Sequence, residues 1–294
     1  MLSQQNTFST ILDPFKDLIE DRIHHYVNSL GEKTPLRDAC EYALLNGGKR
    51  FRPALVFMVA KTLGFGSDVS EAALAVEFFH TASLIADDLP CMDNDDMRRN
   101  KPSTHKVYGE SVALLATYAL ISAGYSLLAK NAETIRAAHL PFSNRSAELC
   151  VKALENVTYN TGIFGATGGQ FLDILPPDLS LESLCDIIHK KTGTLFEISF
   201  VLGWIYGGGD LDKLDLVKKA SSHFGLAFQI ADDIGDMNQD KINGRLINIA
   251  NLFGKEKAVQ MFHEEIIKFK ELLIFQSSEL NGLANFLVSQ ISPK

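Results

Sequence analysis

The sequence has few of the residues on which disulfide-rich and zinc-binding proteins depend. It holds only four cysteines in 294 residues, and Cys40, Cys91, Cys150 and Cys185 do not stand at zinc-ligand spacings. A chain of this size needs no disulfides to fold, so we expect free thiols in a reducing compartment. The N-terminus also lacks a basic segment followed by an apolar one, the pattern of a signal peptide. These absences predict a cytoplasmic protein.

An excess of positive charge is missing as well. Lysine and arginine total 28 against 36 aspartates and glutamates, for a formal net charge of -8. Nucleic-acid surfaces are broadly basic, so we expect no nucleic-acid partner. Basic residues gather only locally, in Lys49-Arg50-Phe51-Arg52 and in Arg98-Arg99-Asn100-Lys101. Local basic clusters in an acidic chain indicate a small anionic ligand.

Strand-like alternation of polar and apolar residues is scarce, and no repeat or low-complexity linker divides the chain. The hydrophobic fraction is 46%, which is enough for a sizeable core. Phe15, Leu18, Ile19 and Ile23 illustrate the helical spacing that dominates instead. We therefore predict a single all-α domain over residues 1–294. Helices are expected at residues 15–30, 53–63, 70–88, 103–131, 146–170, 180–206, 212–236, 253–274 and 277–291.

Residues 111–129 carry no charge, which makes them the only stretch that resembles a membrane span. The stretch contains Thr117, Tyr118, Tyr125 and several serines, so it is only moderately apolar. A helix buried on all sides in a large bundle has the same composition. We predict such a buried helix and no membrane span.

Two aspartate clusters are the most informative features of the chain. The first reads Asp87-Asp88-Leu89-Pro90-Cys91-Met92-Asp93 and the second reads Asp232-Asp233-Ile234-Gly235-Asp236. Each is expected to end an apolar helix. A solvated acidic helix end would explain one cluster, but two such clusters favour a site in which cations separate repelling carboxylates. Oxygen ligands favour Mg²⁺, which is commonly shared with substrate phosphates. The pattern predicts a metal-bridged diphosphate site with one cluster on each wall.

The spacing within the clusters predicts which side chains share a face. Gln229, Asp232 and Asp236 stand at i, i+3 and i+7, so they lie on one face of a helix. In the first cluster Pro90 disfavours a helical conformation at the residue before it. Asp93 must therefore reach the site from an irregular segment.

The glycine pair and three cations of 47–53 precede a predicted helix, whose first N–H groups bind anions. Arginine offers a planar fork to diphosphate oxygens and lysine a point charge. A solvated basic turn is the alternative for this segment. Lys191-Thr192-Gly193 and Gly168-Gly169-Gln170 are weaker signals on their own.

Taken together, these segments resemble the short-chain trans-isoprenyl diphosphate synthases, the farnesyl/geranylgeranyl diphosphate synthase family. The resemblance runs from about Ala43 to near the C-terminus and rests on the order of all these motifs. It implies an all-α, single-domain helical bundle around a central cavity, of the isoprenoid synthase type, that forms a homodimer. It also implies a Mg²⁺-dependent prenyltransferase that joins isopentenyl diphosphate to an allylic diphosphate.

The resemblance further assigns roles to individual residues. Three Mg²⁺ ions are expected with substrate bound. Their implied ligands are Asp87, Asp88, Asp93, Asp232 and Asp236. Arg98, Lys191 and Gln229 would hold the allylic diphosphate, and Thr192 would stabilise the cation formed from it. The implied isopentenyl diphosphate site consists of Gly47, Lys49, Arg52, His80 and Arg99.

Some positions depart from the family pattern. Ala86 stands where histidine is usual, and Tyr118 stands where aspartate is usual. The loop after Asp236 is about ten residues shorter than expected on this resemblance, so a lysine that contacts diphosphate is missing from it, and Lys241 or Arg245 are the candidates to replace it. These departures put the turnover rate in question more than the type of reaction.

Product length is predicted from the residue five before the first aspartate, which helps set tail length in the family. Here it is Ala82, a small residue that favours geranylgeranyl diphosphate (C20) over farnesyl diphosphate (C15). Ser83 neighbours it, and Tyr118 is expected to lie across the tail pocket and shorten the product. The alternatives are a farnesyl diphosphate synthase, a non-catalytic subunit of a heteromeric synthase and a class I terpene cyclase.

Overall fold

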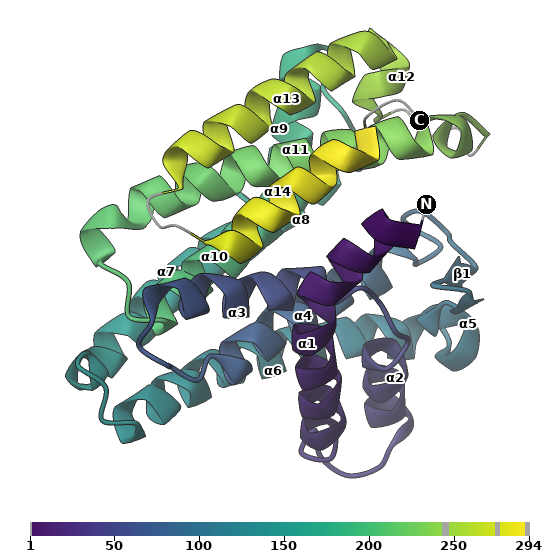
Figure 1. Ribbon diagram of the computed structural model, residues 1–294. Helices are drawn as coiled ribbons and strands as arrows, with labels where there is room; N and C mark the ends of the chain where they lie inside the picture. Colours follow the sequence, from purple (N-terminus) through teal and green to yellow (C-terminus); the bar gives the residue numbers. More distant parts are fainter. Residues whose placement is uncertain (1, 243–246, 274–276, 292–294) are drawn as a thin grey trace.

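The computed structural model describes residues 2–242, 247–273 and 277–291, with side chains from Leu12 onward. It confirms the all-α prediction, because the strands in this part of the chain are limited to a hairpin of β1 (Met97–Arg98) and β2 (Lys101–Pro102). Figure 1 shows the helices packed as a bundle. The helices are α1 (Leu2–Val27), α2 (Pro35–Leu44), α3 (Phe51–Leu63), α4 (Ser70–Asp87), α5 (Thr104–Tyr108), α6 (Glu110–Ala137), α7 (Ser146–Thr161), α8 (Ala166–Ile174), α9 (Leu181–Ile188), α10 (Thr194–Tyr206), α11 (Leu214–Ile242), α12 (Ile249–Phe253), α13 (Lys255–Leu272) and α14 (Ser278–Ile291).

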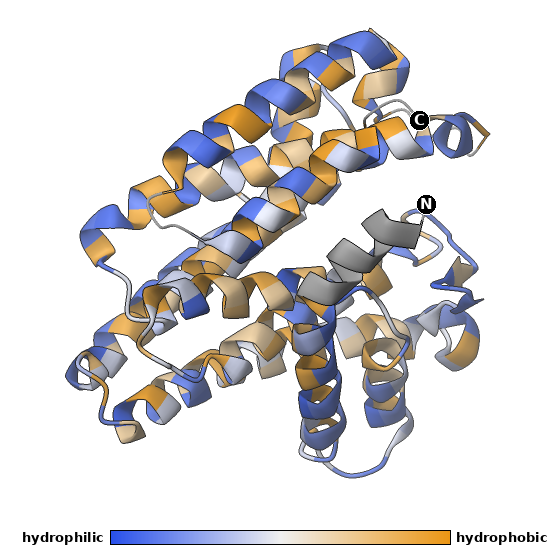
Figure 2. Ribbon diagram, in the orientation of Figure 1, coloured by the Kyte–Doolittle hydropathy of each residue, from blue (hydrophilic) through white to orange (hydrophobic). Residues whose placement is uncertain are grey.

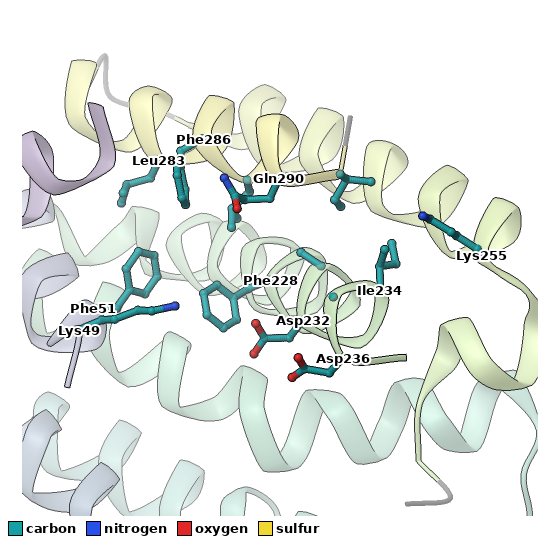
Figure 3. Close-up of a pocket in the computed structure, with 14 residues that line it drawn as sticks. Lys49, Phe51, Phe228, Asp232, Ile234, Asp236, Lys255, Leu283, Phe286 and Gln290 are labelled. Atoms are coloured by element: carbon teal, nitrogen blue, oxygen red, sulfur yellow. The ribbon is translucent and has the colours of Figure 1, made fainter. Parts of the chain in front are cut away.

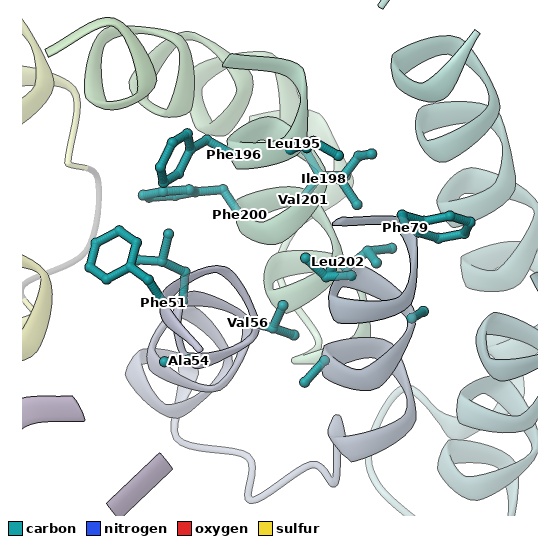
Figure 4. Close-up of a cluster of buried hydrophobic side chains, with 14 of the residues drawn as sticks. Phe51, Ala54, Val56, Phe79, Leu195, Phe196, Ile198, Phe200, Val201 and Leu202 are labelled. Carbon is teal, nitrogen blue, oxygen red and sulfur yellow. The ribbon is translucent and has the colours of Figure 1, made fainter. Parts of the chain in front are cut away.

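The core is centred on α10, which is buried along almost its whole length and packs against α3, α4, α7 and α11. Gly203 allows α10 to approach α3 closely, because a Cβ there would lie 2.6 Å from the carbonyl oxygen of Val56. Figure 4 shows Phe51 of α3 close to Phe196 and Phe200 of α10. Burying each such ring stabilises the fold by about 1.5–3 kcal/mol. The outer helices are amphipathic, and Figure 2 shows polar and apolar residues alternating along α13.

Local sequence signals fix several helix starts. Thr34 caps α2 by accepting a hydrogen bond from the Arg37 amide at 3.3 Å, and Pro35 occupies the first turn. Ser180 caps α9 in the same way through the Ser183 amide at 3.2 Å, as its sequence position predicts. Each cap satisfies an N–H group that would otherwise lack a partner.

Several predicted helix boundaries differ from those observed: α2 and α12 were not predicted, and the predicted helix 103–131 is divided into α5 and α6, with α6 continuing to Ala137. The predicted helix 180–206 is interrupted by a π-helical turn at His189–Gly193, and the predicted helix 146–170 is broken between α7 and α8. The predicted end at residue 236 is wrong, because α11 continues to Ile242. The second aspartate cluster therefore lies within a helix, whereas the first does end α4. The difference follows from Pro90, which has no counterpart after Asp236.

Helix α6 was expected to be buried on all sides, and this is wrong. One face, including Ala116 and Leu120, is fully buried against neighbouring helices, but Leu114, Leu115 and Tyr118 on the other face are 42, 51 and 59% exposed. By length and composition α6 is the one described helix that would qualify as a membrane span, and 39% of its apolar window is buried within the fold. An apolar helix with one covered face also fits a bundle whose outer face meets a partner.

Candidate active site

The structure brings both aspartate clusters to one cavity of about 390 Å³. Asp87 and Asp93 line it from the end of α4, and Asp232 and Asp236 line it from α11. The other polar residues of its lining are Arg98, Asp173, Lys191, Thr192, Gln229, Asp233 and Asp240. The cavity is therefore walled by carboxylates on two sides.

The first wall is held by the turn that Pro90 starts. The Asp93 amide donates to the Asp87 carbonyl at 2.9 Å, which folds the irregular segment back toward the helix end, as the sequence predicts. Burial raises the pKa of Asp87 to about 6, while Lys191 opposes the rise and the Asp93 carboxylate adds to it. The wall thus carries closely spaced negative charge that favours a cation.

Asp88 points elsewhere. It is buried, and Arg98 donates to its carboxylate from Nε at 2.9 Å and from a second nitrogen. Both residues line a separate, much smaller cavity that also includes Asn46 and Thr81. In this structure Asp88 therefore neutralises Arg98, and its expected role as a metal ligand stays a prediction.

The second wall is the middle of α11. Burial raises the pKa of Asp232, and the nearby Asp236 carboxylate raises it further. Asp233 is buried and accepts hydrogen bonds from Gln229 Nε2 at 2.9 Å and from the Ile249 amide at 2.8 Å. Burial raises the pKa of Asp233 to about 6. Asp233 fastens the wall to the following segment, while Asp232 and Asp236 face the cavity.

Two acidic residues of this cavity, Asp173 and Asp240, and the buried Asn248 that supports the second wall were not predicted as site residues. Asp240 lies one turn beyond Asp236, and its carboxylate accepts from Asn248 at 2.8 Å. Asp173 pairs with Lys191 at 2.6 Å. The i+4 spacing from Asp236 was the available signal for Asp240. Arg245, the proposed substitute for a missing lysine, lies outside the described residues, and Lys241 is exposed at the end of α11.

The π-helical turn places Lys191 and Thr192 at the cavity. π-turns within helices are rare and are frequent at functional sites. Gly169 lies directly against this turn, since a Cβ there would be 2.3 Å from the Lys191 backbone nitrogen. Thr192 and Gln229 hydrogen bond through their side chains at 3.1 Å. Gly169, a weak signal in the sequence, is thus explained by close backbone packing, and this packing helps to position Lys191 and Thr192.

Next to the second wall lies a basic group made of the cations Lys49, Arg52 and Arg99 and the imidazole of His80. Burial, together with the charge of Arg99, lowers the pKa of Arg52 to about 10, although Glu77 and Asp232 oppose the shift. Burial and the neighbouring arginines also lower the pKa of His80 well below its usual value. Arg52 Nε and His80 Nδ1 are buried without a hydrogen-bond partner in the described part of the chain. Arginine charges that destabilise one another, with polar nitrogens of Arg52 and His80 left unpaired, form a site for an anion.

Arg50 differs from its basic neighbours. It is buried and pairs with Glu20 at 2.7 Å and with Glu77. Its charge is neutralised inside the fold, so Arg50 serves structure. The alternative of a solvated basic turn does not hold for this segment, because Arg50 is buried and Arg52 stacks 4.7 Å over the Phe196 ring.

A second large cavity, of about 480 Å³, borders the other side of Asp232 and Asp236. Figure 3 shows Lys49 extending toward Phe228 and Asp232 across it, with Phe286 of α14 opposite. The charges of Lys49 and Arg52 act on Asp232 and partly offset the rise in its pKa. The acidic cavity and the basic group are therefore contiguous through one aspartate.

The donor set fits Mg²⁺. Carboxylate oxygens line both walls, and among the described residues no three acidic, histidine or cysteine side chains converge on one metal-sized point. Mg²⁺ takes one or two carboxylates in most sites and completes its shell with water and substrate phosphate oxygens. Pairs of carboxylates facing a roomy cavity suit that mode of binding.

The residues expected to set product length lie in different environments. Ala82 is buried in α4, and Ser83 is half-buried with its hydroxyl donating to the His80 carbonyl at 2.9 Å. Tyr118 is 59% exposed on the outer face of α6. It lines none of the three cavities described here, and its expected effect on product length stays a prediction.

The chain is thus an all-α bundle in which carboxylates from two helices line one cavity. Residues 33–245 match the sequence profile of the polyprenyl synthetase family. The chain belongs to this family.

Individual relatives agree with the assignment. A heterodimeric geranylgeranyl pyrophosphate synthase large subunit 2 of Arabidopsis thaliana is 38% identical over 246 residues, covering 78% of this chain and 62% of the plant protein. The farnesyl diphosphate synthase of Bacillus subtilis (strain 168) is 34% identical, covering 82% of this chain and 80% of the bacterial protein. The crystal structure of a geranyltransferase from Legionella pneumophila superimposes with a TM-score of 0.82 at 27% identity over 98% of both chains. The chain thus spans less than two thirds of the length of the plant relative.

Proposed function

We propose that this protein is a Mg²⁺-dependent prenyltransferase that condenses isopentenyl diphosphate with an allylic diphosphate to form geranylgeranyl diphosphate. The observation that carries the proposal is the contiguity of two unlike sites. A cavity with carboxylates on two walls adjoins the basic group that includes Lys49 and Arg52, and Asp232 borders both. The first suits a diphosphate held through metal ions, and the second suits a diphosphate held directly by cations.

The reaction begins when the bond between C1 and oxygen of the allylic diphosphate breaks and the diphosphate leaves with the electron pair. Three bound Mg²⁺ ions would neutralise much of the departing charge. Lys191, which pairs with Asp173 at 2.6 Å, and Arg98 stand at the same cavity to contact the diphosphate. Preorganised cations of this kind stabilise a transition state without reorganising.

The isopentenyl double bond then attacks the allylic cation, and loss of a proton to the released diphosphate completes the product. The Thr192 hydroxyl, held by Gln229 at 3.1 Å, is placed to stabilise the cation by its oxygen dipole. We assign the second diphosphate to Gly47, Lys49, Arg52, His80 and Arg99. This basic group argues against a class I terpene cyclase, which has no second diphosphate substrate.

We propose a homodimer formed through the exposed face of α6 and α7. Leu115 and Tyr118 of α6 and Tyr159 of α7 are more than half exposed in the chain. A contiguous apolar face on packed helices favours a protein partner. The name of the plant relative includes heterodimeric assembly, so a heteromer with a sister subunit is the alternative. Light scattering of the purified chain distinguishes them, because a monomer in solution would contradict the homodimer.

One assay tests the proposal. The purified chain is incubated with labelled isopentenyl diphosphate and either dimethylallyl, geranyl or farnesyl diphosphate, with Mg²⁺ or with a chelator. We expect Mg²⁺-dependent elongation to C20. A product that stops at C15 would favour farnesyl diphosphate synthase, and Ala82 would then not set the length. If no primer is elongated, the prenyltransferase assignment fails for the isolated chain and a non-catalytic subunit becomes the better interpretation.

The cytoplasm is the expected compartment of the protein.

A further inference from the structure

The turn between β1 and β2 holds Arg99 in a conformation that arginine seldom adopts, whereas asparagine, present at Asn100, adopts it more readily. Its two turn residues, Arg99 and Asn100, have φ angles of 53° and 63°. Positive φ at both positions is the requirement of a tight two-residue hairpin turn, where glycine is common. Side chains larger than glycine persist in such conformations when surrounding contacts hold them. The contacts that hold this turn are therefore of interest.

Two side chains, one in α2 and one just after it, donate hydrogen bonds to the two strands of the hairpin. The Asn46 Nδ2 group donates to the Arg98 carbonyl at 3.2 Å, and the Tyr42 hydroxyl donates to the Pro102 carbonyl at 2.6 Å. Because a carbonyl can only accept, the amide nitrogen of Asn46 must face Arg98. We call these two contacts the clasp.

The clasp lies beside the glycine pair. The Arg99 guanidinium donates to the Gly47 carbonyl. It lies flat against Gly48, since a Cβ there would be 2.6 Å from Arg99 Cζ. The loop that leads to Lys49 and Arg52 is thus joined to the hairpin from both directions.

The hairpin serves two sites with consecutive residues. Arg98 lines the acidic cavity and pairs with Asp88, whereas Arg99 belongs to the basic group and lowers the pKa of Arg52. A shift of the hairpin would move both guanidinium groups together. Two fixed backbone carbonyls, those of Arg98 and Pro102, therefore determine the placement of cations in both sites.

The polar atoms of the Asn46 side chain, rather than its size, make it suitable for holding the hairpin. It is 8% exposed, and its Oδ1 and the Thr81 hydroxyl are buried without a partner in the described residues. Both residues line a cavity of about 20 Å³ with Arg98 and Arg99. A cavity of this size accommodates about one water molecule, which would satisfy both atoms.

We propose that Asn46 and Tyr42 are positioning residues that orient Arg98 and Arg99 and thereby couple the two diphosphate subsites. The inference rests on the proposed function for the identity of the ligands. It predicts a joint effect on two substrates from residues that contact neither.

The experiment compares Asn46→Ala and Tyr42→Phe with Tyr206→Phe in the full chain. Tyr206 is a matched control, because its hydroxyl also donates to a backbone carbonyl, that of Leu128 at 2.8 Å, in α6 rather than at the hairpin. We expect the apparent KM for isopentenyl diphosphate and that for the allylic primer to rise together, about three- to tenfold, in each clasp variant. Tyr206→Phe should leave both KM values unchanged even if it lowers the melting temperature.

Calorimetric titration of inorganic diphosphate with Mg²⁺ provides a readout that is independent of turnover. We expect weaker binding in both clasp variants than in the wild type. If the wild type binds diphosphate but is inactive, the proposed function is contradicted, whereas the positioning role of the clasp is not. Unchanged KM values and unchanged diphosphate affinity in Tyr42→Phe, or a change confined to one substrate, would overturn the clasp even if Asn46→Ala failed to fold. The absence of diphosphate binding by the wild type would overturn both.

Discussion

The two acidic walls of the cavity are built in opposite ways. The first is the end of α4, where Pro90 stops the helix and an irregular, hydrogen-bonded turn brings Asp93 back toward the helix end. Cations act directly on its carboxylates, since the charges of Lys191 and Arg98 both oppose the rise in the pKa of Asp87. The second wall is a continuous stretch of α11. Neither Asp232 nor Asp236 forms an ion pair with any residue in the described part of the chain.

This contrast teaches how one site divides its tasks. The cations that act on the first wall are ready to contact a leaving diphosphate, and they offset part of the repulsion between its carboxylates. The second wall is supported by neutral amides, with Gln229 and Asn248 donating to the α11 aspartates Asp233 and Asp240. It therefore depends more on bound cations for its charge balance.

The largest expected effect on turnover comes from removing one aspartate from either acidic wall. Asp87→Ala and Asp232→Ala should each lower turnover by about a thousandfold or more, because the departing charge then lacks its metal ligands. Circular dichroism should show the helical fold unchanged. Asp186→Ala is the matched control, since Asp186 pairs only with Lys190 on an exposed face of α9. Near-normal activity of either wall variant would show that the metal assignment is wrong.

The next largest effect distinguishes the role of the acidic walls from that of the basic group, because it concerns the KM of one substrate. Lys49→Ala should raise the apparent KM for isopentenyl diphosphate by about tenfold, and that for the allylic primer much less, because Lys49 lies on the basic side of Asp232. Steady-state kinetics with each substrate varied in turn measures this difference. Lys61→Ala provides the control, as Lys61 is paired with Glu279 far along the chain. Equal rises in the two KM values would place Lys49 between the sites.

A third prediction concerns the amide support of the second wall. Asn248 is fully buried, caps α12 and donates to Asp240 and to the Asp233 carbonyl at 3.0 Å. Asn248→Ala should lower the free energy of unfolding by about 1–3 kcal/mol, because it leaves buried acceptors unpaired. It should also raise the Mg²⁺ concentration required for half-maximal activity. Chemical denaturation and a metal titration measure the two effects, and a change in stability without a change in metal requirement would confine Asn248 to a structural role.

Much of this architecture could be predicted from the sequence. Helical periodicity gave the fold class, and the i, i+3, i+7 spacing gave the face shared by Gln229, Asp232 and Asp236. Pro90 predicted the irregular course of the first cluster. These are local signals, and each depends on neighbouring residues in the chain.

The features that sequence alone did not reveal are those set by distant contacts. The pairing of Asp88 with Arg98 joins a helix end to a hairpin, and the hydrogen bond from Asn248 to Asp240 joins the start of α12 to the end of α11. The exposure of Tyr118 depends on which helices pack against α6. The π-turn at Lys191 reflects backbone packing against Gly169, which a mid-helix glycine signals only weakly. Tertiary packing determines such details, and spacing cannot.

The smallest expected effect is one of stability, and it sharpens the contrast between the walls. Burial raises the pKa of Asp87 from its usual 3.8 to about 6, so the folded state binds this proton more tightly than the unfolded state does. The contribution of Asp87 to stability is therefore most favourable below pH 4 and is lost as the pH rises through 6. Without Mg²⁺, Asp87→Asn should be more stable than the wild type at pH 7 by about 1–2 kcal/mol, after allowance for partial solvent screening. The gap should close as the pH falls toward 4, and added Mg²⁺ with diphosphate should narrow it at pH 7 by stabilising only the wild type. Thermal melts of both proteins across this range measure the gap, with Asp186→Asn as the control. If Asp87→Asn is less stable than the wild type at pH 7 in the absence of metal, burial does not destabilise the ionised Asp87 carboxylate as described here, and the charges of Lys191 and Arg98 already compensate for it.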